Sequence, residues 1–166
     1  MNKFKEIIPY IVILIVVILI RSFIVTPVRV NGPSMDKTLK DKEIMILNKL
    51  ASIKRGDIVV VDIGSEKVIK RIIGLPGDSI YCQEGKLYIN DKLYKENYTS
   101  SDTNDFTKEY LNDDEYFVMG DNRAVSMDSR TFGPISKKQI LGVSNFVLFP
   151  FNRFGKVKWL KLNRKI

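Results

Sequence analysis

A continuous apolar run near the N-terminus constrains this chain more than any other feature of its sequence. Residues 7–20 read IIPYIVILIVVILI and contain no charged side chain. As a helix, these residues span about 21 Å, which is shorter than the roughly 30 Å hydrocarbon core of a bilayer. Extension to Val25 gives about 28 Å, provided that Arg21 reaches the headgroups. We therefore expect residues 1–25 to form a single-pass membrane anchor, with its span at about 7–25.

A cleavable targeting signal is the alternative interpretation of this run. Lys3 and Lys5 supply a basic start, but the residues that follow the run read RSFIVTPVRV and offer no small-x-small cleavage site. A retained anchor is therefore favoured. Charge alone does not fix its orientation, because Arg21 and Arg29 lie just beyond the run.

The composition excludes several kinds of active site. The chain has no histidine, and Cys82 is its single cysteine. A Ser-His-Asp triad, a Cys-His pair, a histidine zinc site and an intramolecular disulfide are therefore excluded. A hydrolase made from this chain would need a carboxylate, a lysine or the N-terminal amine as its base. We expect Cys82 to be a buried or half-buried apolar residue, and we expect no metal and no cofactor.

The formal net charge of +8 is spread along the chain, with one local basic cluster at residues 153–165. Beside a membrane segment, a basic surface is typical of attraction to anionic lipid headgroups. This favours membrane lipid as a partner, with ordinary solubility as the alternative and no role in binding nucleic acid.

After Pro27 the sequence changes to short apolar runs separated by Gly, Pro, Asn and Asp, which predicts a mainly β domain over residues 26–166. The Asn90-Asp91 pair predicts a tight hairpin. Helices are expected only at Ser136–Leu141 and Lys37–Lys42. The polar stretch Glu96–Asp114 is interpreted as a loop, within a small excursion from the main sheet at about 82–115. The predicted strands are Ile44–Leu47, Asp57–Ile63, Lys67–Ile73, Ser79–Tyr81, Lys86–Ile89, Tyr116–Met119 and Val143–Phe149.

The first segment that could carry chemistry is Asn31-Gly-Pro-Ser-Met35. Gly32 and Pro33 favour a turn, so that the Ser34 hydroxyl would lie on irregular backbone shortly after the membrane segment. A reactive group there would work close to the bilayer surface. A plain linker turn is the alternative.

The second segment is VIKRIIGLPGD, residues 68–78, which places Lys70 inside an apolar β-type run. Strand alternation directs Lys70 to one face and Arg71 to the other. If the Lys70 face is buried, desolvation favours the neutral amine and lowers its pKa, which makes it a competent general base. The alternative is an exposed strand lysine.

The third segment is MGDNRAVSMDSR, residues 119–130. It combines two acids, two arginines and two serines within a short loop, although solvated charge runs are common. Bidentate Arg–Asp pairs could hold such a loop rigidly against a strand. A serine there could orient a lysine amine, as a third group orients the base in catalytic triads.

Together, these three segments resemble the type I signal peptidase family in its compact Gram-positive form. A Ser-Met pair follows the anchor in that family, as Ser34-Met35 does here. A KR…GLPGD string is matched by Lys70-Arg71 and the residues after it, and a GDNR…S.DSR…G string is matched at 120–133. The motifs occur in the family's order and span the anchor and nearly the whole domain.

The resemblance implies a membrane-bound serine endopeptidase that removes signal peptides from secreted preproteins. It implies Ser34 as the nucleophile, Lys70 as the general base and Ser126 as a hydrogen-bond partner of the lysine amine. An ion pair between Asp128 and Arg130 would hold the third segment. The catalytic domain would lie on the extracytoplasmic face of the cell membrane.

Further roles follow from the same resemblance. Asp121 and Arg123 would support the site nearby, and the substrate would add as an extended strand beside an exposed edge. Shallow pockets for small side chains would have apolar walls, which we expect to be Val30, Met35, Leu39 and Ile69.

Two positions depart from the family pattern. Lys37 stands where family members usually have proline, and Gly32 stands where some members place a hydroxyl that helps to form the oxyanion hole. The hole would then depend on backbone N–H groups, including that of Ser34, or on another donor. Each donor lowers the barrier by roughly 2.7–4 kcal/mol, so the departure affects rate and not reaction type.

Three other functions also fit parts of the sequence. Ser34-Met-Asp-Lys37 matches the Ser-x-x-Lys string of penicillin-binding acyltransferases, but the Lys-Thr-Gly element of those enzymes does not occur. A non-catalytic, membrane-tethered binding domain would not need Ser34. A self-cleaving Ser-Lys protease of the SOS-repressor type would not need an anchor.

Overall fold

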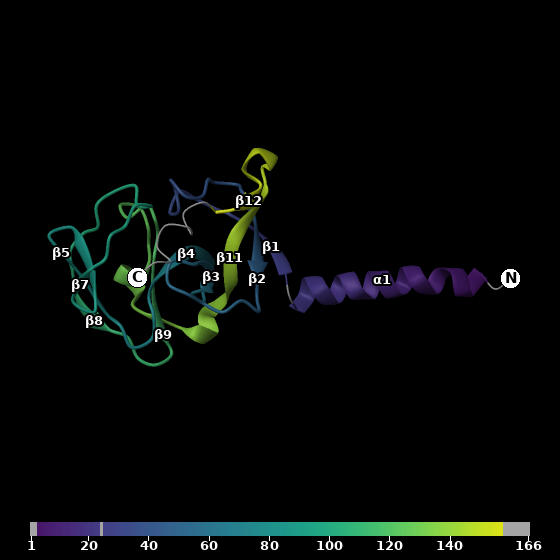
Figure 1. Cartoon of the computed structure of the whole chain (residues 1–166), viewed down its shortest axis with the longest axis horizontal. Helices are drawn as coiled ribbons and strands as arrows, with labels where there is room; N and C mark the ends of the chain where they lie inside the picture. Colours follow the sequence, from purple (N-terminus) through teal and green to yellow (C-terminus); the bar gives the residue numbers. More distant parts are fainter. Residues whose placement is uncertain (1–2, 24, 158–166) are drawn as a thin grey trace.

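The computed structural model describes residues 3–23 and 25–157 (Figure 1). Its first element is the helix α1, Lys3–Phe23, which extends away from a β domain (Figure 1). Large apolar side chains of α1 between Ile7 and Ile18 are 46–73% exposed. Among the described residues, no helix combines the length and the apolar character needed to cross a membrane.

The fold is mainly β, as the short apolar runs between turn residues predict, and it contains two sheets. The strands of the larger sheet pair in an antiparallel manner, and β12 (Gly155–Lys156) joins it by pairing with β11. In spatial order the other strands are β1 (Val25–Arg29), β2 (Ile44–Asn48), β11 (Ile140–Phe149), β3 (Ile58–Asp62), β4 (Lys67–Gly74), β9 (Glu115–Met119) and β10 (Ile135–Ser136).

The smaller sheet overlaps the predicted excursion. Its strands are, in spatial order, β7 (Lys92–Leu93), β6 (Lys86–Ile89), β5 (Ser79–Gln83) and β8 (Phe106–Tyr110). The hairpin predicted at Asn90-Asp91 is confirmed: both residues have positive φ, at 52° and 62°, as the type I′ turn between two twisted strands requires.

The core forms where apolar strands are buried on both faces. In β3, Ile58 packs with Met35 and Leu39 on one side, whereas Val59 and Val61 pack with Ile72 and Val118 on the other. Such strands read as continuous apolar runs because neither face meets water. A third cluster, which includes Phe117, Ile80 and Leu87, joins the smaller sheet to the larger one.

All seven predicted strands are confirmed, but both predicted helices are wrong. At Lys37–Lys42 the backbone forms turns, because Lys37 and Lys42 adopt positive φ values of 83° and 70° that end any helical path. At Ser136–Leu141 a single 3-10 turn, Lys137–Gln139, lies between β10 and β11, and a capping box of Ser136 and Gln139 closes it. The short helix that does form is α2, Ser129–Phe132, with Asp128 at its N-cap. A further 3-10 turn lies at Phe151–Arg153.

The loop predicted at Glu96–Asp114 is correct only in part, because β8 lies inside it. Most side chains of β8 are exposed, so the strand lacks the apolar alternation that would predict it. Hydrogen-bonded pairing with β5 stabilises β8 as a strand in place of such a pattern.

Candidate active site

Lys70 lies in the middle of β4 and is buried, with only 3% of its surface exposed. Its amine forms no hydrogen bond and no ion pair with the residues that the structure describes. Burial lowers the pKa of the Lys70 amine below its usual value, against the attraction of Asp128 and Glu66, and Arg130 lowers it further. A neutral amine can accept a proton, so this lysine has the properties of a general base.

Gly120 brings the serines of two motifs together. In the antiparallel pairing of β4 with β9, Arg71 lies opposite Met119, so the same register places Gly120 beside Lys70. A Cβ atom at Gly120 would lie 2.2 Å from Ser126 Oγ and 2.6 Å from the carbonyl oxygen of Ser34. Only glycine, which has no Cβ atom, allows this approach. The turn that contains Ser34, the side chain of Ser126 and the strand position of Lys70 therefore all lie next to Gly120.

A backbone hydrogen bond fixes the turn that contains Ser34 against the third segment, residues 119–130, which is also called the third motif below. The Asn122 N–H donates to the Ser34 carbonyl oxygen at 3.0 Å. The Ser34 N–H has no acceptor among the described residues, whereas the Gly32 N–H donates to Asp41 Oδ1 at 2.9 Å. Of these two backbone donors near the serine, only the Ser34 N–H is left for a developing oxyanion.

Ser126 is half-buried, and its Oγ atom is fully buried without a hydrogen-bond partner in the described part of the chain. The hydrogen bond expected between Ser126 and the Lys70 amine is therefore not formed in this structure. The Ser126 hydroxyl packs instead against the backbone of Gly120. A buried polar atom without a partner is uncommon and marks a strained or functional position.

The ion pair expected between Asp128 and Arg130 is present and bidentate. Arg130 Nε lies 2.8 Å from Asp128 Oδ1, and Arg130 Nη2 lies 2.9 Å from Oδ2. Asp128 also accepts the Gly120 N–H at 2.9 Å. Burial opposes the charge on Asp128, but Arg130 and the Gly120 N–H hold the pKa of the carboxyl below its usual value.

Asp121 and Arg123 are both buried, but they pair with residues outside their own segment. Arg71 donates from Nε and Nη2 to the two carboxylate oxygens of Asp121, at 2.8 and 2.5 Å. Arg123 pairs with Glu96 and donates from Nε to the Gly120 carbonyl oxygen at 3.0 Å. Lys70 and Arg71 thus serve opposite faces of β4, as the alternation predicts.

Three residues of this network were not found by sequence reasoning. Glu96 and Thr103 accept hydrogen bonds from Arg123, and the Tyr98 ring lies 4.2 Å below the guanidinium carbon of Arg71. They occur in a polar stretch without periodicity or a motif, so the sequence carried no signal that could have found them.

The four predicted pocket walls belong to one apolar cluster. Val30, Met35 and Leu39 are at most 2% exposed and form its interior. Ile69 is half-buried against them and is the member with accessible surface. If the cluster lines a substrate pocket, Ile69 is the residue through which it does so in this conformation.

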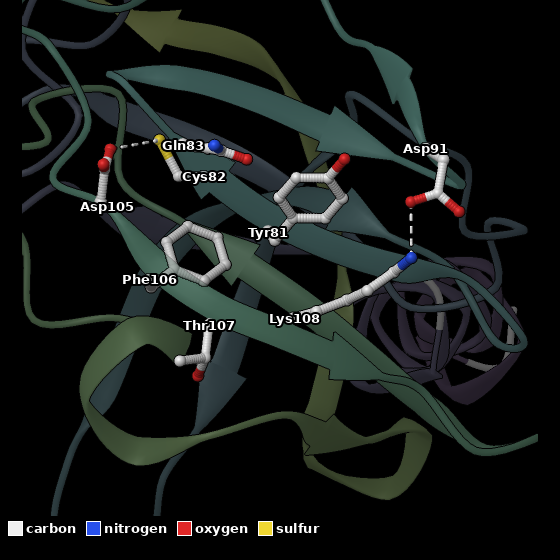
Figure 2. Close-up of a pocket in the computed structure, with 8 residues that line it drawn as sticks. All are labelled: Tyr81, Cys82, Gln83, Asp91, Asp105, Phe106, Thr107 and Lys108. Atoms are coloured by element: carbon white, nitrogen blue, oxygen red, sulfur yellow. Dashed lines mark hydrogen bonds and ion pairs between the residues drawn. The ribbon is translucent and has the colours of Figure 1, made fainter.

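An open pocket of about 580 Å³ lies on the smaller sheet, and Figure 2 shows the residues that line it. None of the predicted site residues is among them. The pocket includes Cys82, which is 3% exposed, and its thiol lies beside Asp105 (Figure 2). Burial and then the Asp105 charge raise the pKa of the Cys82 thiol to about 11, so it stays protonated at neutral pH and is a poor nucleophile.

Comparison with known proteins defines the family. The family model described as signal peptidase, peptidase S26, matches residues 4–149. The chain therefore belongs to the S26 family of signal peptidases. Within that family it is a type I signal peptidase, a serine endopeptidase that removes signal peptides.

Individual relatives support this placement. Signal peptidase I of Bacillus amyloliquefaciens is 43% identical over 164 residues, which cover 89% of each chain. Signal peptidase IB of Staphylococcus aureus (strain COL) is 33% identical over 178 residues, which cover 90% of this chain and 93% of that protein. The crystal structure of a signal peptidase I from Enterococcus faecalis V583 matches with a TM-score of 0.51 and 31% identity, over 56% of this chain and 97% of that one.

Proposed function

We propose that Ser34 is the nucleophile and Lys70 the general base of this signal peptidase. The observation that carries the proposal is a buried lysine amine without a partner, beside the glycine at which Ser34 and Ser126 meet. The chain contains no histidine, and the Cys82 thiol lies in another part of the fold. Lysine is then the base that this site can supply.

In the proposed reaction the Ser34 hydroxyl attacks the carbonyl carbon at the end of the signal peptide, and Lys70 accepts the hydroxyl proton. Collapse of the tetrahedral intermediate breaks the C–N bond, and Lys70 gives the proton to the leaving amine. Water, deprotonated by Lys70, then hydrolyses the acyl-enzyme and restores Ser34. The negative charge on the carbonyl oxygen would be stabilised by the Ser34 N–H, which has no acceptor among the described residues.

The third motif would hold the base in place. Ser126 would donate or accept a hydrogen bond at the Lys70 amine once the site is occupied, which would satisfy its buried hydroxyl. Asp128 and Arg130 would keep that loop rigid through their bidentate pair. Asp121 and Arg123 would support it from the opposite side of β4, through Arg71 and Glu96.

The substrates would be secreted preproteins, bound as extended strands. In the described part of the chain β1 pairs only with β2, so its outer edge offers backbone donors and acceptors just before the Ser34 turn. Ile69, with Val30, Met35 and Leu39 behind it, would form the wall that favours small side chains before the cut.

The N-terminal segment proposed as the anchor, residues 1–25, would hold the enzyme in the cell membrane through α1, because Val25 already pairs in β1. The catalytic domain at 26–166 would lie on the extracytoplasmic face. The support is the exposed apolar surface of α1 between Ile7 and Ile18, which lipid would cover. Membrane fractions washed with alkaline carbonate test this: the full chain should stay in the pellet. Release into the supernatant would contradict the anchor.

The dyad is tested by cleavage of a purified preprotein with the full-length protein in detergent or lipid. Ser34→Ala and Lys70→Ala should each lower kcat/KM by at least about 10³-fold, as loss of a nucleophile or its base does elsewhere. Ser65→Ala and Lys67→Ala are matched controls, because both residues are exposed and Lys67 lies on the same strand as Lys70. Normal cleavage by Ser34→Ala or Lys70→Ala would refute the assignment.

A further inference from the structure

One segment, part exposed and part buried, touches all three stretches of chain that carry the proposed site. We call residues 96–103 the bridging segment. It lies between β7 and β8, in the polar stretch that the sequence presents as a featureless loop. Its contacts reach the Ser34 turn, the Gly120–Arg130 loop and the strand that carries Lys70.

The contact with the Ser34 turn is made by Lys37. Lys37 Nζ donates to the Thr99 carbonyl oxygen at 2.8 Å, across a large separation in sequence. The backbone of Lys37 has φ = 83°, in the left-handed region that few residues other than glycine adopt.

The contacts with the Gly120–Arg130 loop involve both backbone and side chains. The Ser100 N–H donates to the Asp121 carbonyl oxygen at 3.0 Å, and the Ala124 N–H donates to Ser101 Oγ at 3.1 Å. Glu96 pairs with Arg123, which in turn donates to the Gly120 carbonyl oxygen. Glu96 is therefore linked to Gly120, where Ser34 and Ser126 meet, through the side chain of Arg123 alone.

The contact with the Lys70 strand passes through Tyr98. The Tyr98 hydroxyl donates to Glu96 Oε1 at 2.6 Å, and its ring stacks on the Arg71 guanidinium. Arg71 and Arg123 are both almost completely buried, at 1% and 2% exposed. Glu96 is thus the acidic centre of a buried network that joins β4 to the third motif.

We infer that the bridging segment positions the catalytic groups relative to one another, with Glu96 and Lys37 as its positioning residues. The inference rests on the proposed Ser34–Lys70 dyad and adds residues that touch neither reacting atom. Ser34, Gly120 and Lys70 come from separate strands and turns, so their mutual placement depends on what ties those elements together. The bridging segment contacts each of these elements, though not the three residues themselves. Small misplacements of reacting groups have large effects on rate.

The test compares each positioning variant with a matched control in the full-length protein. Lys37→Met removes the contact with Thr99, and Lys42→Met is its control, because Lys42 is also exposed and has φ = 70°. Glu96→Gln removes the charge that pairs with Arg123, and Glu109→Gln removes an exposed acid on β8. For every variant, kcat, KM and the pH profile are measured on a preprotein at a temperature well below its Tm.

We expect Lys37→Met and Glu96→Gln to lower kcat at least about fivefold with KM within about twofold of wild type. In Glu96→Gln the acid limb of kcat/KM should also move to higher pH, because a looser loop admits water to the Lys70 amine. A purely structural role would lower Tm without moving the pH profile. The two control variants should match wild type in kcat, KM and pH profile.

Wild-type kcat and pH profile in both positioning variants would overturn the inference, and so would an equal loss in the controls. These outcomes are separable from failure of the dyad. If Ser34→Ala is inactive while the Glu96 and Lys37 variants are normal, only the positioning role is lost. If Ser34→Ala remains active, the proposed site itself is wrong.

Discussion

Replacing Gly120 by alanine would place a methyl group where Ser34 and Ser126 meet. The new carbon would lie 2.2 Å from Ser126 Oγ, 2.5 Å from Ser126 Cβ and 2.6 Å from the Ser34 carbonyl oxygen. Favourable contacts between heavy atoms lie at about 3.5–4.0 Å, so neighbouring groups must move by roughly 1 Å. Two of the three contacts involve Ser126, and the third is backbone of the Ser34 turn.

The size of the effect follows from that displacement. Overpacking a buried position costs about 1–3 kcal/mol of stability. Misplacement of catalytic groups by about 1 Å can lower the rate by about 10²-fold. We therefore expect Gly120→Ala to fold with a lower Tm and to lose about two orders of magnitude in kcat.

Gly74→Ala provides a matched control for this substitution. Its Cβ would meet Leu111 Cδ1 at 2.5 Å and Phe117 Cβ at 2.9 Å, in the apolar cluster next to the smaller sheet and without a contact to Ser34 or Ser126. The assay is initial-rate cleavage of a preprotein by full-length protein, together with thermal unfolding. Gly74→Ala should lower Tm and keep most of kcat. A normal kcat in Gly120→Ala, or an equal loss in Gly74→Ala, would refute the reasoning.

Two further predictions concern buried charges. The pKa of Lys70 lies below 10.5 in the folded protein, so stability should rise with pH between the folded and unfolded values. Lys70→Met should therefore be more stable than wild type by an amount that grows as pH falls from 10.5, and Tm measured across pH checks this. Asp128→Asn breaks the pair with Arg130 and should cost roughly 3–5 kcal/mol at neutral pH by denaturant unfolding. Because the pKa of Asp128 is lowered from 3.8, that cost should shrink as pH falls below 3.8; a cost that does not depend on pH would contradict the ion-pair explanation.

The strands were predictable because short apolar runs bounded by turn residues are a local signal. The turn at Lys37–Lys42 was not, because a positive φ in a lysine is imposed by the packing of Met35 and Leu39 and by the hydrogen bond of Lys42 with Val30. For the same reason β8 was missed: its exposed side chains carry no pattern, and its order comes from pairing with a strand far away in sequence.

The sequence predicted one pair of partners in the site, Asp128 and Arg130, but it did not predict the partners of Asp121 and Arg123. The family resemblance placed Asp121 and Arg123 near the site as supporting residues and named no partner for either. In the fold Asp121 pairs with Arg71 and Arg123 with Glu96, because pairing of buried charges is decided by which strands lie side by side. Glu96 had no motif to mark it.

The distribution of these pairs bears directly on catalysis. Among the described residues, the buried basic side chains are Lys70, Arg71 and Arg123. Both guanidiniums, which keep their proton at any ordinary pH, are paired with carboxylates. The amine, which can lose its proton, has no such partner and relies on neutralisation to be stable in the interior. A carboxylate within bonding distance of Lys70 would keep it charged and useless as a base. The fold thus pairs the two buried arginines, which do not lose their proton at ordinary pH. It leaves Lys70 unpaired, and the proposed role of Lys70 as a base requires that it lose its proton.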